Sequence, residues 1–168
     1  KFLKLVDAAD ISLDKNHLKL YTKGKSIPAV FKLNKDFMTL LGMWMAEGSY
    51  TKGGIKLSIH ESELDGIKNL CEKQFGSVTV YRNKDSRGVD VILNSTAMEK
   101  FMKNVLGFES GARNKNIPDF VFNLKMEFMS AFLRGYFSGD GAVYSNRHNV
   151  PQVEAVTVSS SLADDLLY

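Results

Sequence analysis

The chain has 168 residues, 44% of them hydrophobic and 24% charged, a balance that excludes an intrinsically disordered protein. Its longest apolar stretches fall short of the roughly 18 residues that cross a membrane, and no signal-peptide pattern is present, so we expect a cytoplasmic protein. One cysteine and three scattered histidines exclude a disulfide framework and the usual zinc spacings. A net charge of +3 is compatible with a polyanionic partner but does not identify one.

The apolar pattern between residues 37 and 107 predicts a helix, two strands, a helix, two strands and a helix, in that order. Apolar side chains recur at helical spacing over 37–48, 64–75 and 96–106, where we expect the helices. They alternate with polar side chains over 55–60, 78–80 and 89–93, which we expect to include a strand and a hairpin. Three pairs of a hydroxyl residue and an acid are typical of helix starts: Ser62 with Asp65, Thr96 with Glu99, and Ser161 with Asp164.

The second half of the chain begins in the same way. A helical run over 128–141 precedes expected strands at 140–144 and 153–159 and a helix from Ser161. Only 28 residues follow Asp140, whereas the first unit extends about 60 residues beyond Glu47. We therefore expect the native polypeptide to continue for about 35 to 40 residues beyond Tyr168. Without them, the second unit should leave apolar surface and a sheet edge uncovered.

These repeats divide the chain into four segments. Residues 1–34 are expected to be a lead-in or linker, 35–107 a first unit, 108–123 a second linker, and 124–168 an incomplete second unit. A Lys-x-Ile-Pro pattern occurs twice, at Lys25 and at Lys115. The counterpart of Lys115 in the repeat would follow the second acid, so we interpret Lys25 as part of the lead-in.

Each of the two long helical runs ends in a small residue, an acid and a glycine, which places Glu47 and Asp140 93 residues apart. Gly42 and Gly135 lie five residues before these acids, where a missing side chain lets two helices pack closely. Such packing would bring together two carboxylates at helix ends that already carry negative partial charge. A divalent cation relieves this repulsion, and oxygen-only ligation favours Mg²⁺ (or Mn²⁺) and phosphodiester hydrolysis. Either acid alone would mark only a helix end; the pair indicates a site.

The segments LLGMWMAEG (Leu40 to Gly48) and LRGYFSGDG (Leu133 to Gly141), with Lys115 ahead of Ile117-Pro118, resemble the paired signatures of the LAGLIDADG homing-endonuclease family. The resemblance extends from about Ile27 to Tyr168 and is closest to endonuclease domains carried within archaeal inteins. It implies an α+β fold of two αββαββα units about a pseudo-twofold axis, with the second unit incomplete in this chain. It also implies strands in the DNA major groove and metal-dependent cleavage of both strands.

The same resemblance assigns roles to three residues. It implies that Glu47 and Asp140 are catalytic and bind the metal, and that Lys115 is catalytic near the scissile phosphate. Glu47 departs from the family pattern, in which aspartate is commoner, and this leaves the metal geometry open. The alternative for Lys115 is a solvated lysine before a turn.

Polar side chains on the predicted strands are candidates for DNA contact. They alternate with apolar residues and so share one sheet face, and basic residues occupy the hairpin tip. The candidates are Lys56, Ser58, His60, Tyr81, Arg82, Lys84, Arg87 and Arg147. An ordinary solvated sheet face would show the same pattern, and His60 suits a strand end better than a metal site.

The sequence thus predicts an endonuclease for double-stranded DNA, intein-borne or free-standing, that acts as a pseudo-symmetric monomer when complete and has no membrane partner. One alternative is a non-cleaving DNA or RNA binder, or a maturase, on the same fold. A structural domain that ignores nucleic acid is another. Splicing chemistry is not assigned, because His148-Asn149 is followed by Val150 inside the second unit.

Overall fold

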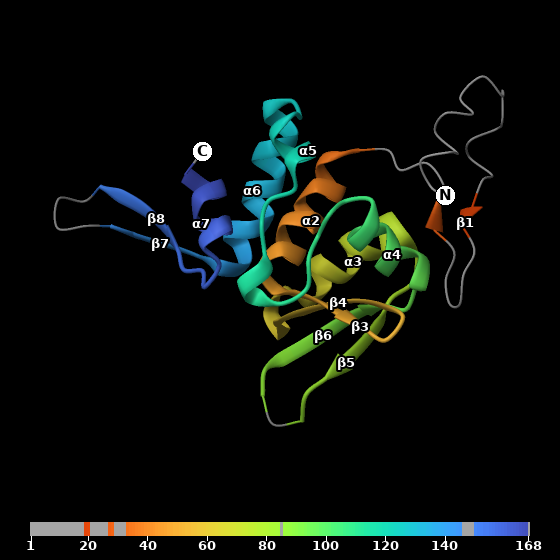
Figure 1. The fold of residues 1–168 in the computed structure, drawn as a ribbon. Helices are drawn as coiled ribbons and strands as arrows, with labels where there is room; N and C mark the ends of the chain where they lie inside the picture. Colours follow the sequence, from red (N-terminus) through yellow and green to blue (C-terminus); the bar gives the residue numbers. More distant parts are fainter. Residues whose placement is uncertain (1–18, 21–26, 29–32, 85, 146–149, 168) are drawn as a thin grey trace, which may run out of the picture.

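Two long helices that lie side by side form the centre of the molecule (Figure 1). The computed structural model describes residues 19–20, 27–28, 33–84, 86–145 and 150–167. The elements in chain order are β1 (Lys19–Leu20), β2 (Ile27–Pro28), α2 (Lys35–Glu47), β3 (Gly48–Thr51), β4 (Gly54–His60), η1 (Glu61–Glu63), α3 (Leu64–Phe75), β5 (Thr79–Arg82), β6 (Gly88–Leu93), α4 (Thr96–Asn104), η2 (Ala112–Asn114), α5 (Asp119–Phe122), α6 (Met126–Asp140), β7 (Gly141–Ser145), β8 (Pro151–Ala155) and α7 (Ser160–Leu167). None of the helices in these ranges is long and apolar enough to cross a membrane.

The order of elements agrees with the order predicted from the sequence. Helix α2, strands β3 and β4, helix α3, strands β5 and β6 and helix α4 follow one another as expected, and α6, β7, β8 and α7 repeat the first four steps. All the strand pairs described are antiparallel. This mixture of helices and antiparallel sheets confirms the α+β class. Lys25 and Arg147 lie outside the described residues, so the expectations for them stay predictions.

Helices α2 and α6 touch each other through their main chains. Nine of the thirteen residues of α2 are buried, so the helix is enclosed on nearly every side. A methyl group on Gly42 would overlap the carbonyl oxygen of Phe132 and lie 2.8 Å from the amide nitrogen of Tyr136. A methyl group on Gly135 would overlap the carbonyl oxygen of Thr39. The contact is therefore reciprocal, and both positions require glycine.

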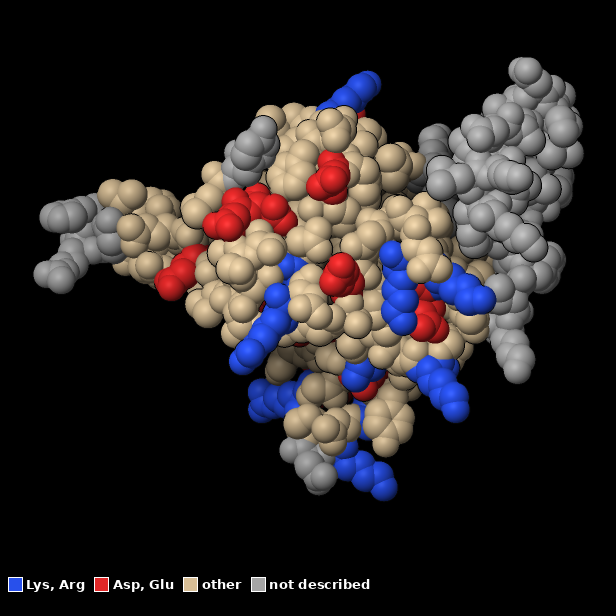
Figure 2. Space-filling view, in the orientation of Figure 1, with Lys and Arg blue, Asp and Glu red and all other residues tan. Residues whose placement is uncertain are grey.

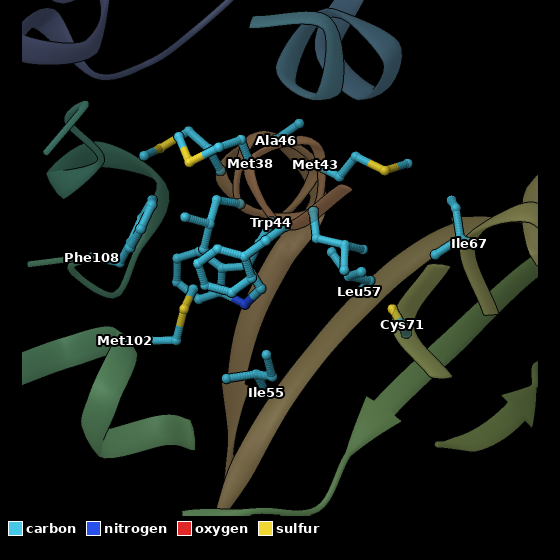
Figure 3. Packing of buried hydrophobic residues seen from close by; sticks show 14 of the residues in the cluster. Met38, Met43, Trp44, Ala46, Ile55, Leu57, Ile67, Cys71, Met102 and Phe108 are labelled. Atoms are coloured by element: carbon cyan, nitrogen blue, oxygen red, sulfur yellow. The ribbon is translucent and has the colours of Figure 1, made fainter. Parts of the chain in front are cut away.

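The four-stranded sheet has the order β3-β4-β6-β5, and helices α2, α3 and α4 pack against it. Its buried side chains alternate along β4 and β6, where Leu57 lies opposite Val91. Trp44 connects α2 to this layer: the centre of its ring lies 4.8 Å from that of Tyr50 in β3. It lies 5.3 Å from the ring centre of Phe108 (Figure 3). The core thus fixes α2 against the sheet.

Strands β7 and β8 form a separate hairpin that extends from the end of α6 (Figure 1). Val143 and Val153 face each other across it, with 76% and 60% of their surfaces exposed. Helix α7 returns to the core, where Leu162 is buried. The uncovered apolar surface expected in the second half of the chain is therefore present on this hairpin.

Helices α3 and α4 begin at Leu64 and Thr96, as the apolar pattern predicts, but the capping residues that the three hydroxyl–acid pairs predict are wrong. Ser95, and not Thr96, accepts the capping hydrogen bond from Met98 N, while Glu99 accepts from Gly53 N. A 3-10 turn precedes α3, and His60 caps it at the strand end.

At α7 the capping residue is Ser159. Strand β8 ends at Ala155, so the strand expected over 153–159 is shorter. In each case the capping group stands earlier in the chain than the matching hydroxyl–acid pair indicates.

The glycine contact predicts a difference between two Gly→Ala substitutions. Gly42→Ala should destabilise the fold by about 1–3 kcal/mol or more, because the new methyl group forces two main chains apart. Gly66→Ala is the matched control: this helical glycine in α3 has no neighbour within 4 Å of an added Cβ, and alanine should raise stability by about 0.5–1 kcal/mol. Urea unfolding followed by circular dichroism measures both. Equal stability of the Gly42 variant and the natural chain would contradict the reciprocal contact.

Candidate active site

The ends of α2 and α6 bring two carboxylates to one place. Glu47 is the last residue of α2 and Asp140 the last of α6. A glycine follows each acid and donates its amide hydrogen to the carbonyl four residues back, so both helices end in the same way. A Cβ atom on Gly139 would lie 3.0 Å from Cγ of Glu47, so the end of α6 touches the Glu47 side chain. The glycine contact one turn earlier sets this arrangement.

Both carboxyl groups are electrostatically unfavourable in this position. Burial raises the pKa of Glu47, the charge of Asp140 raises it further, and Lys115 opposes the rise. Burial likewise raises the pKa of Asp140, again against the effect of Lys115. Neither helix has a basic residue in its last turn to offset the negative end of its dipole. The site therefore favours a proton or a cation beside the pair.

Lys115 reaches this pair from the loop before α5. Its Nζ donates a hydrogen bond of 2.7 Å to the carbonyl oxygen of Ala46, the residue next to Glu47. Burial lowers the pKa of Lys115, and the charges of Asp140 and Glu47 oppose that effect. The three residues that the sequence singles out thus lie together, although 25 and 68 positions separate Lys115 from the two acids along the chain.

The donor set suits a hard divalent cation. Within the described ranges no cluster of three or more histidine, cysteine, aspartate or glutamate side chains is placed to hold a metal. Two carboxylates alone leave most coordination positions to water and to phosphate oxygens, which is how Mg²⁺ usually binds in phosphate chemistry. The residues present therefore fit a hard cation such as Mg²⁺ or Mn²⁺ whose remaining ligands are water or phosphate oxygens.

Two candidate DNA-contacting residues of β4, Lys56 and Ser58, both contact Asp90 on the neighbouring strand β6. Lys56 Nζ lies 3.2 Å from Asp90 Oδ2, and Ser58 Oγ donates to Asp90 Oδ1 at 2.8 Å. Asp90 lies opposite Ser58 in the register of β4 and β6, which explains the contact. His60 is exposed and caps the following turn.

The β5–β6 hairpin carries the remaining described candidates. Tyr81 is 64% exposed, and Arg82 Nε lies 3.6 Å from Glu61 Oε1. Lys84 and Arg87 are exposed at the hairpin tip. Lysine and arginine side chains gather at the lower edge of the face in Figure 2, around this hairpin. The structure thus presents a basic projection on the four-stranded sheet.

Three residues near these sites carry no signal in the sequence that singles them out: Asp90, Ser159 and Asp165. Ser159 Oγ donates to the carbonyl oxygen of Lys115, and Asp165 Oδ2 accepts from the amide of Ile117. These contacts join segments more than 40 residues apart, and no local pattern signals them.

Comparisons with known proteins identify a family-model match and several relatives of the chain. Residues 127–168 match the model of the LAGLIDADG-like domain. The chain is 35% identical over 127 residues to DNA-directed RNA polymerase subunit Rpo1C of Methanocaldococcus jannaschii, a match that covers 74% of this chain and 14% of that protein. It is 36% identical over 129 residues to a DNA polymerase of Thermococcus hydrothermalis, with 74% and 7% covered. It is 32% identical over 156 residues to the ATP-dependent DNA helicase Hel308 of Thermococcus kodakarensis, with 88% and 14% covered.

These findings define the class of protein: it has a mixed α+β fold with the two signature helices, α2 and α6, at its centre. The chain carries a LAGLIDADG-like domain, and the family expected from its sequence is confirmed. It spans less than a fifth of the length of these relatives.

The raised pKa values of the two carboxyl groups predict a pH-dependent stability. A carboxyl group whose pKa is raised by folding stabilises the fold fully below its ordinary pKa, and this stabilisation is lost as the pH rises through the folded value. Metal-free Glu47→Gln and Asp140→Asn should therefore unfold at higher temperature than the natural chain at pH 7, and the gain should vanish below about pH 4. Thermal unfolding across this pH range measures it, with exposed Asp164→Asn as the control. A gain that is equally large at low pH would contradict the electrostatic cause.

Proposed function

We propose that this chain is the DNA-cutting part of an intein-borne homing endonuclease, which hydrolyses both strands of a specific double-stranded site with Mg²⁺ or Mn²⁺. One observation carries the proposal: two helices in main-chain contact end in a pair of partly buried carboxylates, with a lysine from a third segment beside them. A partly buried acidic pair of this kind costs stability, which a purely structural role does not explain.

Glu47 and Asp140 would hold the metal through their carboxylate oxygens. A bound divalent cation supplies activation of water and neutralisation of phosphate charge. Lys115 keeps its ammonium group beside the pair, where it would stabilise negative charge that develops on the scissile phosphate. Its hydrogen bond to the Ala46 carbonyl fixes the approach of the ammonium group before DNA arrives.

The identity of the relatives supports an inserted element. An RNA polymerase subunit, a DNA polymerase and a helicase catalyse different reactions, yet each contains a segment similar to most of this chain. In each the segment is at most 14% of the protein. A shared segment that none of the three reactions requires is best explained by insertion of one mobile element into different host genes. Its DNA target would then be the host gene without the insertion.

A single chain supplies both acids, so the proposed active form is a monomer. Glu47 and Asp140 come from different helices of the same polypeptide, and Gly42 and Gly135 already fill the contact that a second copy would need. The β5–β6 hairpin, with Lys84 and Arg87 exposed at its tip, would contact the DNA backbone on one side of the site.

Substitution of Asp140 separates binding from cleavage. Asp140→Asn keeps the shape of the side chain and removes one metal ligand, so DNA affinity should persist while cleavage falls by about 100-fold or more. The assay uses the complete protein that carries this chain, Mg²⁺, and a plasmid with the uninterrupted host site; chelation by EDTA should abolish cleavage. Asp164→Asn, an exposed acid of α7, is the control and should cleave normally. Salt-sensitive binding without any cleavage by the natural protein would favour the non-cleaving binder or maturase instead.

The basic hairpin tip predicts a salt effect. Lys84→Gln and Arg87→Gln should each weaken DNA binding regardless of base sequence and reduce the slope of log affinity against log salt by about 0.9. Lys100→Gln is the control. It removes an exposed charge from α4, a helix that packs against the sheet, and should leave the slope unchanged. Fluorescence anisotropy at several salt concentrations measures the slopes. An unchanged slope in both hairpin variants would place the DNA elsewhere.

A further inference from the structure

The segment that carries Lys115 has no regular secondary structure of its own. Residues 115–118 connect the 3-10 turn η2 to the short helix α5. A main chain of this kind has no helix or ladder hydrogen bonds to hold it, so its position depends on contacts with other elements. Lys115 adds a long, flexible side chain, whose tip is only as well placed as the main chain behind it.

Two hydrogen bonds from the C-terminal region hold this main chain on both sides of Asn116. Ser159 Oγ donates to the carbonyl oxygen of Lys115 at 2.6 Å, and Asp165 Oδ2 accepts from the amide nitrogen of Ile117 at 2.7 Å. Ser159 is 1% exposed, and Ile117 is 3% exposed. Both bonds are therefore partly buried.

The Ser159 hydroxyl group is itself fixed. While it donates to Lys115, its oxygen accepts the amide hydrogen of Leu162 at 3.2 Å, so it also caps α7. Asp165 lies on α7, close to two turns further along the chain. One helix thus supplies both bonds, and the loop follows the position of α7.

We propose that Ser159 and Asp165 are positioning residues that hold Lys115 at the carboxylate pair by fixing the main chain on both sides of Asn116. The proposal rests on the function proposed above, in which Lys115 assists phosphate hydrolysis. Its physical basis is geometric: Lys115 Nζ meets the Ala46 carbonyl at 2.7 Å, and a main-chain shift of about 1 Å is enough to cost a catalytic group much of its effect.

Two variants, two rescues and two controls test this inference. Ser159→Ala and Asp165→Ala each remove one hydrogen bond to the loop. Ser159→Thr keeps the hydroxyl group and Asp165→Asn keeps an acceptor oxygen, so both should behave like the natural chain and assign any loss in the alanine variants to the missing hydrogen-bonding groups. Ser161→Ala and Asp164→Ala change exposed residues of the same helix and serve as controls.

The first measurement needs neither DNA nor metal. The rate at which an amine-reactive reagent acylates Lys115, read by peptide mass spectrometry relative to exposed Lys125, should rise several-fold in the two alanine variants and stay unchanged in the controls. Amide hydrogen exchange of Ile117 should rise with it in Asp165→Ala. Unchanged acylation of Lys115 in both alanine variants would overturn the inference, whatever the activity.

The second measurement is cleavage by the complete protein. In the alanine variants kcat should fall about 10- to 100-fold while KM for DNA stays unchanged, because these residues act on Lys115 and not on the DNA surface. A change in KM or kcat that also occurs in the control variants would overturn the inference as well. If the natural protein cleaves no DNA, the proposed function fails, and the acylation rates alone decide the role of Ser159 and Asp165.

Discussion

The reciprocal contact of Gly42 and Gly135 is the constraint on which the rest of the molecule depends. Each glycine faces a carbonyl group of the other helix, so α2 and α6 fit together in one register only. The acids follow five residues later in both helices, and the same register therefore brings their ends together. The sheet, the core around Trp44 and the loop with Lys115 are all arranged about this helix pair.

The charged site lowers the stability of the fold. Apolar residues in place of the two carboxylates and the partly buried lysine would be more stable, because the two helix ends already carry negative partial charge. Lys115 compensates only in part, because burial penalises its own charge as well. The apolar burial along α2 offsets that cost, since nine of its own residues between Phe37 and Ala46 are buried.

Patterns that repeat along the chain were predictable, and contacts between distant segments were not. The periodicity of apolar residues gave the helices and the strands, and the spacing of glycine and acid gave the helix pair. Hydrogen bonds such as those of Asp90 with Ser58, or of Ser159 with Lys115, depend on which surfaces meet after folding. The capping residues differ from the prediction for a related reason: Ser95 and Ser159 cap their helices from the preceding segment, and the hydroxyl–acid pattern alone does not distinguish them from nearby hydroxyl residues.

The three charged residues of the site come from three different parts of the chain, and this makes their assembly cooperative. Glu47 ends the helix that is packed on the four-stranded sheet, whereas Asp140 ends α6, which leads into the hairpin of β7 and β8. Lys115 belongs to neither helix, and its main chain is held by Ser159 and Asp165 from beyond that hairpin. The acids therefore meet only when α6 is docked on α2, and the lysine joins them only when α7 is also in place. A partly folded chain would hold the carboxylates without their counter-charge, which is the least favourable of the possible combinations.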